Sequence, residues 1–226
     1  MPPMTNRLQD EVLRLFPPPL PDGSVRALCI ELAGPADWSS LGALWRGVQA
    51  ELDLPAPGIA INGRHGYQLW FSTAVPVAAT EAESFATALR RRWLAQAAPQ
   101  RVRVLTANLE VILPPQQVAV EQWAAFVAPD LAPVFEDTPW LDVEPGAEGQ
   151  ADLLARQQTI LLDAWQEAMR RLGAAPVPAQ PGPPAVTTAP LVSQESDPHA
   201  FLLRVMNDPH VDMSLRIEAA KALLSN

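Results

Sequence analysis

The chain has 226 residues with 25 prolines, and its formal net charge is −9 at pH 7. Tight sequence-independent DNA binding depends on many Lys and Arg contacts to phosphate, so this charge argues against a general DNA-coating protein. No apolar run approaches the roughly 20 residues that span a bilayer, no secretory signal pattern opens the chain, and a single cysteine, Cys29, excludes an intramolecular disulfide. We therefore expect a cytoplasmic protein without membrane contact.

Apolar spacing predicts the elements of the first half of the chain. A short amphipathic helix is expected over residues 9–16, and a proline run ends it. Two longer helices follow, over 38–52 with Asp37 as N-cap and over about 80–95 with Thr80 and Glu83 as a capping box. Four segments have the short, mostly apolar pattern of β-strands, namely 25–33, 59–61, 67–73 and 102–113.

The order of these elements predicts an α+β fold. Strand, helix, strand, strand, helix, strand is the ferredoxin-like or RRM-like βαββαβ arrangement, here over residues 25–115. We expect a four-stranded sheet in the strand order fourth, first, third, second. Both helices should pack on one face, which leaves the other face free for a ligand or a second layer.

The second half of the chain divides into three predicted parts. Residues 116–145 are interrupted by prolines but rich in large apolar groups, and a single helix is expected over 151–172, so that 116–172 packs onto the core and completes a domain over 1–172. Residues 173–196 have the composition of a flexible linker. Residues 197–226 are expected to form a tethered helical hairpin.

Side-chain alternation along the strands suggests a polar cluster on the helix-free face. It places Glu31, Gln68 and Glu110 on three adjacent strands and pointing the same way. Carboxylate and amide oxygens suit hard divalent cations, so Glu31 and Glu110 are candidate metal ligands and the trio is a candidate catalytic set. The alternative is a polar face without a ligand, or one covered by residues 116–145.

Residues 62–70, with the sequence NGRHGYQLW, carry a resemblance to archaeo-eukaryotic-type primase–polymerases that extends over about residues 25–115. The resemblance implies that Glu31 stands for the acid of the first strand, Gln68 for the family's histidine and Glu110 for the later acid, with Mg²⁺ or Mn²⁺ as cofactor. Ala33 stands where the family has a second acid, and His65 is offset from the histidine position.

The departures favour a non-catalytic module. On this hypothesis the chain binds nucleic acid or nucleotide in a mobile-element or phage-type replication setting, and an active metal-dependent nucleotidyltransferase is a distant third choice. Candidate contacts to phosphate or base are Arg64, His65, Trp70, Arg90, Arg91 and Arg92. The alternatives, which we favour, are a solvated loop at 64–65, cations that complement a helix end at 90–92, and a Trp70 that packs under residues 123–140.

The end of the chain has the sequence FLLRVMNDP at 201–209 and LRIEAAKA at 215–222, and it is similar to a segment of some phage small terminase subunits, over about 25 residues. Two short amphipathic helices bury little surface alone, so the residues suit docking to another chain or to a second copy. A partly folded tail is an equal alternative. The alternative function is therefore a protein–protein adaptor, with a ferredoxin-like scaffold and a docking segment at 197–226. This alternative predicts a covered sheet face and no nucleotide affinity.

Overall fold

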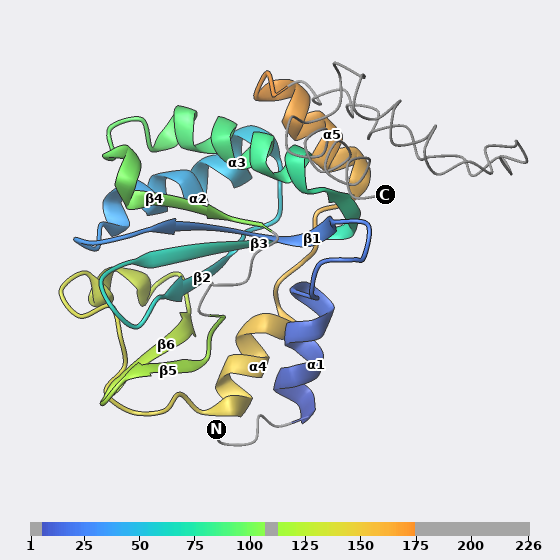
Figure 1. The fold of residues 1–226 in the computed structure, drawn as a ribbon. Helices are drawn as coiled ribbons and strands as arrows, with labels where there is room; N and C mark the ends of the chain where they lie inside the picture. Colours follow the sequence, from blue (N-terminus) through green and yellow to red (C-terminus); the bar gives the residue numbers. More distant parts are fainter. Residues whose placement is uncertain (1–5, 107–112, 175–226) are drawn as a thin grey trace, which may run out of the picture. The chain divides into compact units, whose positions relative to one another are not determined.

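A six-stranded antiparallel sheet runs through the middle of the computed structural model, which describes residues 6–106 and 113–174 (Figure 1). The strand order is β4-β1-β3-β2-β6-β5. The strands are β1 Ser24–Leu32, β2 Gly58–Ile61, β3 Tyr67–Ala78, β4 Val102–Leu105, β5 Gln116–Ala119 and β6 Gln122–Val127.

The sheet has two strands more than predicted. The four predicted strands are neighbours in the order β4-β1-β3-β2, and the hairpin β5–β6 continues the sheet beyond β2 through the pairs from Ile59↔Val127 to Ile61↔Ala125. The prediction of a four-stranded sheet is therefore wrong. The turn of this hairpin has no glycine: Glu121 adopts the positive φ of 54°, so the residues usually found in such turns did not mark it.

Helices cover both faces of the sheet, whereas the sequence predicted helices on one face only (Figure 1). Helices α2 and α3 lie on one side with α5, and α1 and α4 lie on the other. Their bounds are α1 Asn6–Leu15, α2 Trp38–Leu52, α3 Ala79–Trp93, α4 Ala147–Ala155 and α5 Leu162–Arg171, with short 3₁₀ turns at Pro99–Arg101 and Ala132–Phe135.

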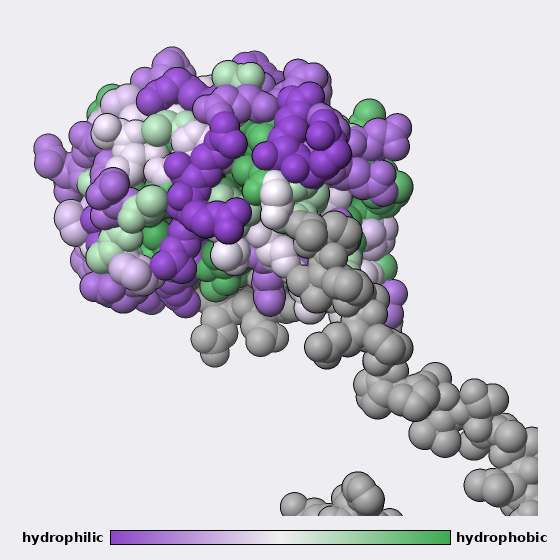
Figure 2. All heavy atoms as spheres, turned by 90° about the horizontal axis from the view of Figure 1, so that it is seen from above, coloured by the Kyte–Doolittle hydropathy of each residue, from purple (hydrophilic) through white to green (hydrophobic). Residues whose placement is uncertain are grey.

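The core under α2, α3 and α5 is apolar. It contains the β1 side chains Leu28, Ile30 and Leu32 together with Phe85 of α3 and Trp165 of α5, as strand alternation predicted for β1. The outer surface of this helix side, seen in Figure 2, is mostly hydrophilic with smaller hydrophobic areas between. This is the ordinary amphipathic arrangement of helices that bury one side and solvate the other.

A second core occupies the opposite face. Residues of α1, α4 and four strands form it together with Phe16, which directly follows α1: Leu8, Val12, Leu15, Phe16, Ala27, Cys29, Ala60, Trp70, Phe126, Ala151 and Leu154. Arg7 pairs with Glu148 and Asp152, which ties α1 to α4. The apolar stripe of α1 was predicted, but its packing partner lies about 140 residues away in sequence. Of the two expectations for this face, a second layer is the one that the structure shows, and it consists of α1 and α4.

The predicted single helix over 151–172 is two helices. Between α4 and α5, the backbone N–H of Ile160 donates to the Ser72 carbonyl at 2.7 Å, and the N–H of Ala74 donates to the Ile160 carbonyl at 2.8 Å. These bonds occupy β3 beyond the last β2 pair, Gly58↔Trp70. The connection therefore continues the sheet locally and places α4 and α5 on opposite faces.

The two predicted helix caps had different outcomes. Asp37 caps α2 as expected, because its carboxylate accepts from the Ser40 N–H at 2.8 Å and from the Ser40 hydroxyl at 2.7 Å. The capping box at Thr80 is wrong: α3 begins one residue earlier, and its N-cap, Ala78, makes no side-chain bond.

Several predictions fall outside the described residues. Among them are the later part of the predicted strand 102–113, with Glu110, almost all of the linker 173–196, and the segment 197–226. In the ranges that the structure does describe, no helix combines the length and apolarity needed to cross a membrane.

Candidate functional site

Strand register brings two of the three predicted site residues together. Arg103 on β4, Glu31 on β1 and Gln68 on β3 are consecutive partners across the sheet, and the same line continues through Ala60 on β2 to Phe126 on β6. Side chains directly opposite each other on antiparallel strands lie within contact distance. The meeting of Glu31 and Gln68 therefore agrees with the prediction, while Glu110 lies outside the described residues.

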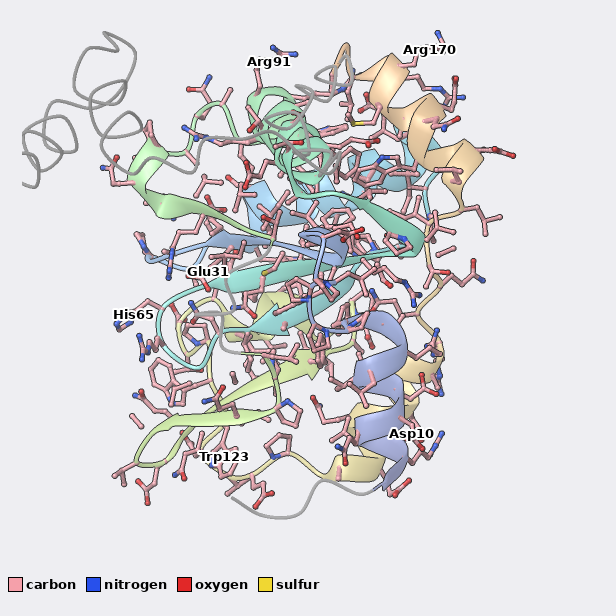
Figure 3. All side chains as sticks on the ribbon, turned by 45° about the vertical axis from the view of Figure 1, so that its right-hand side comes forward. Asp10, Glu31, His65, Arg91, Trp123 and Arg170 are labelled. Carbon is pink, nitrogen blue, oxygen red and sulfur yellow. The ribbon has the colours of Figure 1, made fainter. Side chains whose placement is uncertain are left out.

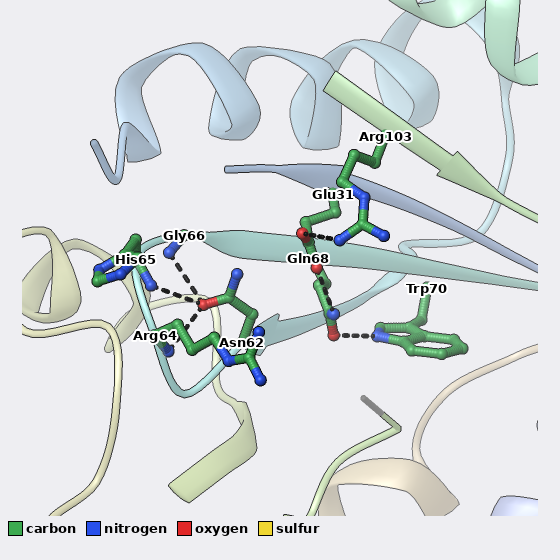
Figure 4. A network of polar contacts seen from close by, with 8 residues as sticks. All are labelled: Glu31, Asn62, Arg64, His65, Gly66, Gln68, Trp70 and Arg103. Atoms are coloured by element: carbon green, nitrogen blue, oxygen red, sulfur yellow. Dashed lines mark hydrogen bonds and ion pairs between the residues drawn. The ribbon is translucent and has the colours of Figure 1, made fainter. Parts of the chain in front are cut away.

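A chain of polar contacts follows this line (Figure 4). Gln68 Nε2 donates to Glu31 Oε2 at 2.8 Å, and Trp70 Nε1 donates to Gln68 Oε1 at 3.0 Å. Arg103 Nη1 lies 3.4 Å from Glu31 Oε1. An amide suits the middle position because it donates to the carboxylate at one end and accepts from the indole at the other.

The site is closed rather than open. Gln68 is fully buried and Glu31 is 7% exposed, while the Arg103 side chain is half exposed. An ionised carboxylate at such a position depends on its hydrogen bonds and its countercharge. We conclude that Gln68 and Arg103 stabilise the buried carboxylate, and that Trp70 fixes the orientation of the Gln68 amide.

The only cysteine lies beside this cluster and offers no nucleophile. Cys29 is paired across the sheet with Trp70 and is completely buried. Burial, and to a smaller degree the charge of Glu31, raises the pKa of the Cys29 thiol well above its ordinary value. Because the thiolate is the reactive form, Cys29 acts as a small apolar core residue.

The described residues do not suit the divalent metal that the primase-like resemblance implies. Both oxygens of Glu31 already have protein donors. Within residues 6–106 and 113–174, no three His, Cys, Asp or Glu side chains gather as a metal-binding group. A Mg²⁺ or Mn²⁺ ion takes several oxygen ligands, so no step can be built through a metal at Glu31.

The β2–β3 turn that carried the resemblance has a structural explanation. The Asn62 Oδ1 accepts from the backbone N–H groups of Arg64, His65 and Gly66, each at 3.0 Å (Figure 4). A Cβ on Gly66 would lie 2.1 Å from the Leu32 carbonyl oxygen. The asparagine and the glycine are thus required by the turn itself, and the side chains of Arg64 and His65 are exposed at its tip.

The predicted arginine cluster lies on the other side of the molecule. Arg90, Arg91 and Arg92 belong to α3. Figure 3 shows Arg91 on the side of the sheet that α3 covers, far from Glu31. Arg92 pairs with Glu51, and Arg91 donates to the Leu172 carbonyl at 3.4 Å. The predicted nucleic-acid residues therefore occupy three separate places: α3, the turn tip, and the buried line of Glu31.

Trp70 is part of the second core. Its side chain is 2% exposed, and its ring centroid lies 5.0 Å from that of Phe16 and 6.4 Å from that of Phe126. A base can stack only on an accessible ring, so the structure does not support the stacking role. The favoured alternative, packing under residues 123–140, agrees in part: Phe126 belongs to that segment, whereas Phe16 directly follows α1.

Sequence reasoning missed two features of this side. Arg103 was not among the candidate site residues, although its register position opposite Glu31 follows once β4 is aligned with β1. A pocket next to the ends of β2 and β6 was not foreseen, because Trp45, Phe126 and Gln157, which line it, come from distant parts of the sequence. No sequence spacing connects these three residues.

No protein-family model matches the chain, and a search of curated proteins found no significantly similar sequence.

Proposed function

We propose that this chain is a non-catalytic protein–protein adaptor, in which an α/β scaffold carries a docking segment at residues 197–226. The observation that carries the proposal is the second core under α1 and α4, because it occupies the sheet face on which ligand binding was expected. A reducing cytoplasm is part of the proposal and suits the single buried cysteine.

The use of polar groups inside the scaffold supports this choice. Gln68 has partners for both amide atoms, and Glu31 has partners for both carboxylate oxygens. Arg101 donates to the carbonyls of Ala33 and Pro35, so it is occupied in fixing the chain between β1 and α2. Side chains engaged in this way hold the fold together and are not available to a nucleotide.

A primase-like nucleic-acid or nucleotide module is the second candidate. It is favoured by the direct contact between Glu31 and Gln68, and by the order β4-β1-β3-β2, which suits a ferredoxin-like unit extended by β6 and β5. This candidate requires the buried line to open. It predicts that binding of single-stranded DNA or a nucleoside triphosphate depends on Glu31.

The single lysine of the chain makes a selective test of the adaptor possible. Lys221 lies in the proposed docking segment, and the α-amino group is the only other amine for an amine-reactive crosslinker. We expect crosslinking of the full chain in its native cells to join Lys221 to a defined partner or to a second copy. Lys221→Arg should abolish the product.

A matched pair of variants tests the apolar side of the segment. Ile217→Asp should reduce the Lys221 crosslink at least about tenfold, because a charge is costly in an apolar contact, whereas Ser214→Asp, on the polar side of the predicted helix, should leave it unchanged. Absence of any Lys221 product would contradict the adaptor. Saturable binding of labelled single-stranded DNA or ATP, lost in Glu31→Gln, would favour the second candidate instead.

A further inference from the structure

An open trough of about 510 Å³ runs along the outer side of α3. Helix residues that are three or four positions apart share one face, and the part of the lining that α3 provides follows this spacing: Thr80, Glu83, Ser84, Thr87, Ala88 and Arg91. Four of these six residues have short side chains, so the floor of the trough is low. Ala88 is buried, and the methyl groups of Thr80 and Thr87 add to its apolar surface.

The last two residues that the structure describes, Gly173 and Ala174, also line this trough. The N–H of Gly173, which has a φ of 62°, donates to the Arg170 carbonyl at 3.1 Å. The N–H of Ala174 donates to the Met169 carbonyl at 3.0 Å. These two bonds are the Schellman pattern of a helix end. The chain therefore leaves α5 in a fixed direction and is already in the trough at Ala174.

The length of the trough can be compared with the length of the chain that follows. Arg91 donates to the Leu172 carbonyl at 3.4 Å, so the end of α5 is held at the Arg91 end of the lining. Thr80, at the other end, is eleven positions earlier in α3, a distance of about 16 Å at a helical rise of about 1.5 Å per residue.

Residues 175–179 have the sequence APVPA, which is uncharged and has a proline at every second position. Proline fixes its own φ and restricts the residue before it to extended conformations, so this sequence favours the polyproline II helix. Five residues at about 3.1 Å each extend over about 16 Å, which equals the distance from Arg91 to Thr80. Glu83 and Arg91 carry opposite charges, so the lining has no net preference for a charged occupant.

We propose that residues 175–179 of the same chain occupy this trough as an extended segment that runs from Arg91 toward Thr80. The occupant follows from the position of Ala174 in the trough, from the matching lengths and from the absence of charge in the segment. Val177 and the two prolines supply apolar groups for the low floor around Ala88. The free part of the linker then begins at residue 180. This inference does not depend on the adaptor function.

Disulfide formation between engineered cysteines in the full chain tests the course of the segment. Cys29 is completely buried and does not compete. With oxidised glutathione at pH 8, the variant Thr80→Cys/Ala179→Cys should close its disulfide at least about fivefold faster than Thr87→Cys/Ala179→Cys, because a disulfide requires close Cα atoms and docking places residue 179 beside Thr80.

A segment that is free in solution predicts the opposite order. Five flexible residues extend over only about 12 Å on average, so residue 179 would meet Thr87 about tenfold more often than Thr80. That order, or failure of both pairs to react, would overturn the proposal. Non-reducing gel electrophoresis separates the products, and a product that joins two chains would assign the trough to the segment of a second copy and would likewise overturn it.

A matched pair of substitutions tests the apolar contact. Added to Thr80→Cys/Ala179→Cys, Val177→Asp should slow disulfide formation at least about fivefold, because a charge is costly in an apolar contact. Val186→Asp, the same change at a residue beyond the proposed segment, is the control and should leave the rate unchanged. Equal rates in the two variants would show that Val177 does not contact the trough and would contradict the docking.

Discussion

The two faces of the sheet bury their side chains by different means. Under α2, α3 and α5, β1 contributes Leu28, Ile30 and Leu32 to an apolar core. Under α1 and α4, the buried positions include Glu31, Gln68 and Ser72. A face made of apolar groups gains by leaving water, whereas buried polar groups need a partner for each donor and acceptor. Burial alone thus does not distinguish an apolar core from a buried polar cluster; the hydrogen-bond partners do.

The largest expected effect comes from the apolar face. Phe85 is fully buried and packs against Phe71 and Trp165, with ring centroids 5.9 Å and 4.4 Å away. Phe85→Ala should lower the free energy of unfolding by about 3–5 kcal/mol, through lost transfer energy and a cavity. Urea unfolding followed by circular dichroism measures it. A loss below 1 kcal/mol would mean that this face is not the tighter core.

An intermediate loss of stability is expected at Gln68, in the middle of the chain of polar contacts from Arg103 through Glu31 to Trp70. Gln68→Met keeps the size of the side chain but leaves Glu31 Oε2 and Trp70 Nε1 without their partner. Unfolding in urea should show a loss of about 2 kcal/mol, since unpaired buried groups carry a desolvation cost. Gln68→Glu is the comparison, because it retains an acceptor for Trp70 but places a second acid against Glu31. A neutral Gln68→Met would remove the structural role assigned to this line.

A smaller loss of stability is expected at Arg103, the exposed end of this chain of polar contacts. Arg103 is half exposed and 3.4 Å from Glu31, so solvent screens much of this pair. Arg103→Met should cost below about 1 kcal/mol, and the double variant with Glu31→Gln should recover part of that loss. If Arg103→Met is as damaging as Gln68→Met, the ion pair and not the amide is the main stabiliser of Glu31.

The smallest effect is a pH dependence at the exposed end of α5. Hydrogen bonds from Arg170 and Arg171 lower the pKa of Glu167 from 4.5 to about 2. Because the folded pKa lies below the unfolded one, the stabilisation is present above about pH 4.5 and is lost as the pH falls toward 2. Glu167→Gln should therefore lower the melting temperature slightly at pH 7 and not at pH 2. A difference that grows in acid would contradict the sign.

Whether a feature of the fold or of the candidate site could be predicted depends on how far apart in the sequence the interacting residues are. Local signals located β1, α2 with its Asp37 cap, and the Asn62 turn, because the residues that decide them are within a few positions of each other. Strand alternation also placed Glu31 and Gln68 on one face. These parts depend on periodicity and capping, which are properties of short segments.

The rest depended on contacts that no short segment contains. The packing of α1 on α4, and hence the covered face, joins residues about 140 positions apart. The break between α4 and α5 has no glycine or proline and is decided by the pairing of Ile160 with β3. The unpaired side-chain oxygen of Gln157 can be recognised only once β2, β6 and α4 are assembled.

The reactivity of Cys29 tests the closed second face most directly. It is the only cysteine, it lies in the second core beside Trp70, and it is completely buried. We predict that a thiol reagent at pH 8 modifies the native chain at least about 100-fold more slowly than the urea-unfolded chain. The buried thiol of the native chain reacts only when the core opens. Rapid modification of the native protein, suppressed by single-stranded DNA or a nucleoside triphosphate, would show an accessible face and contradict the adaptor account.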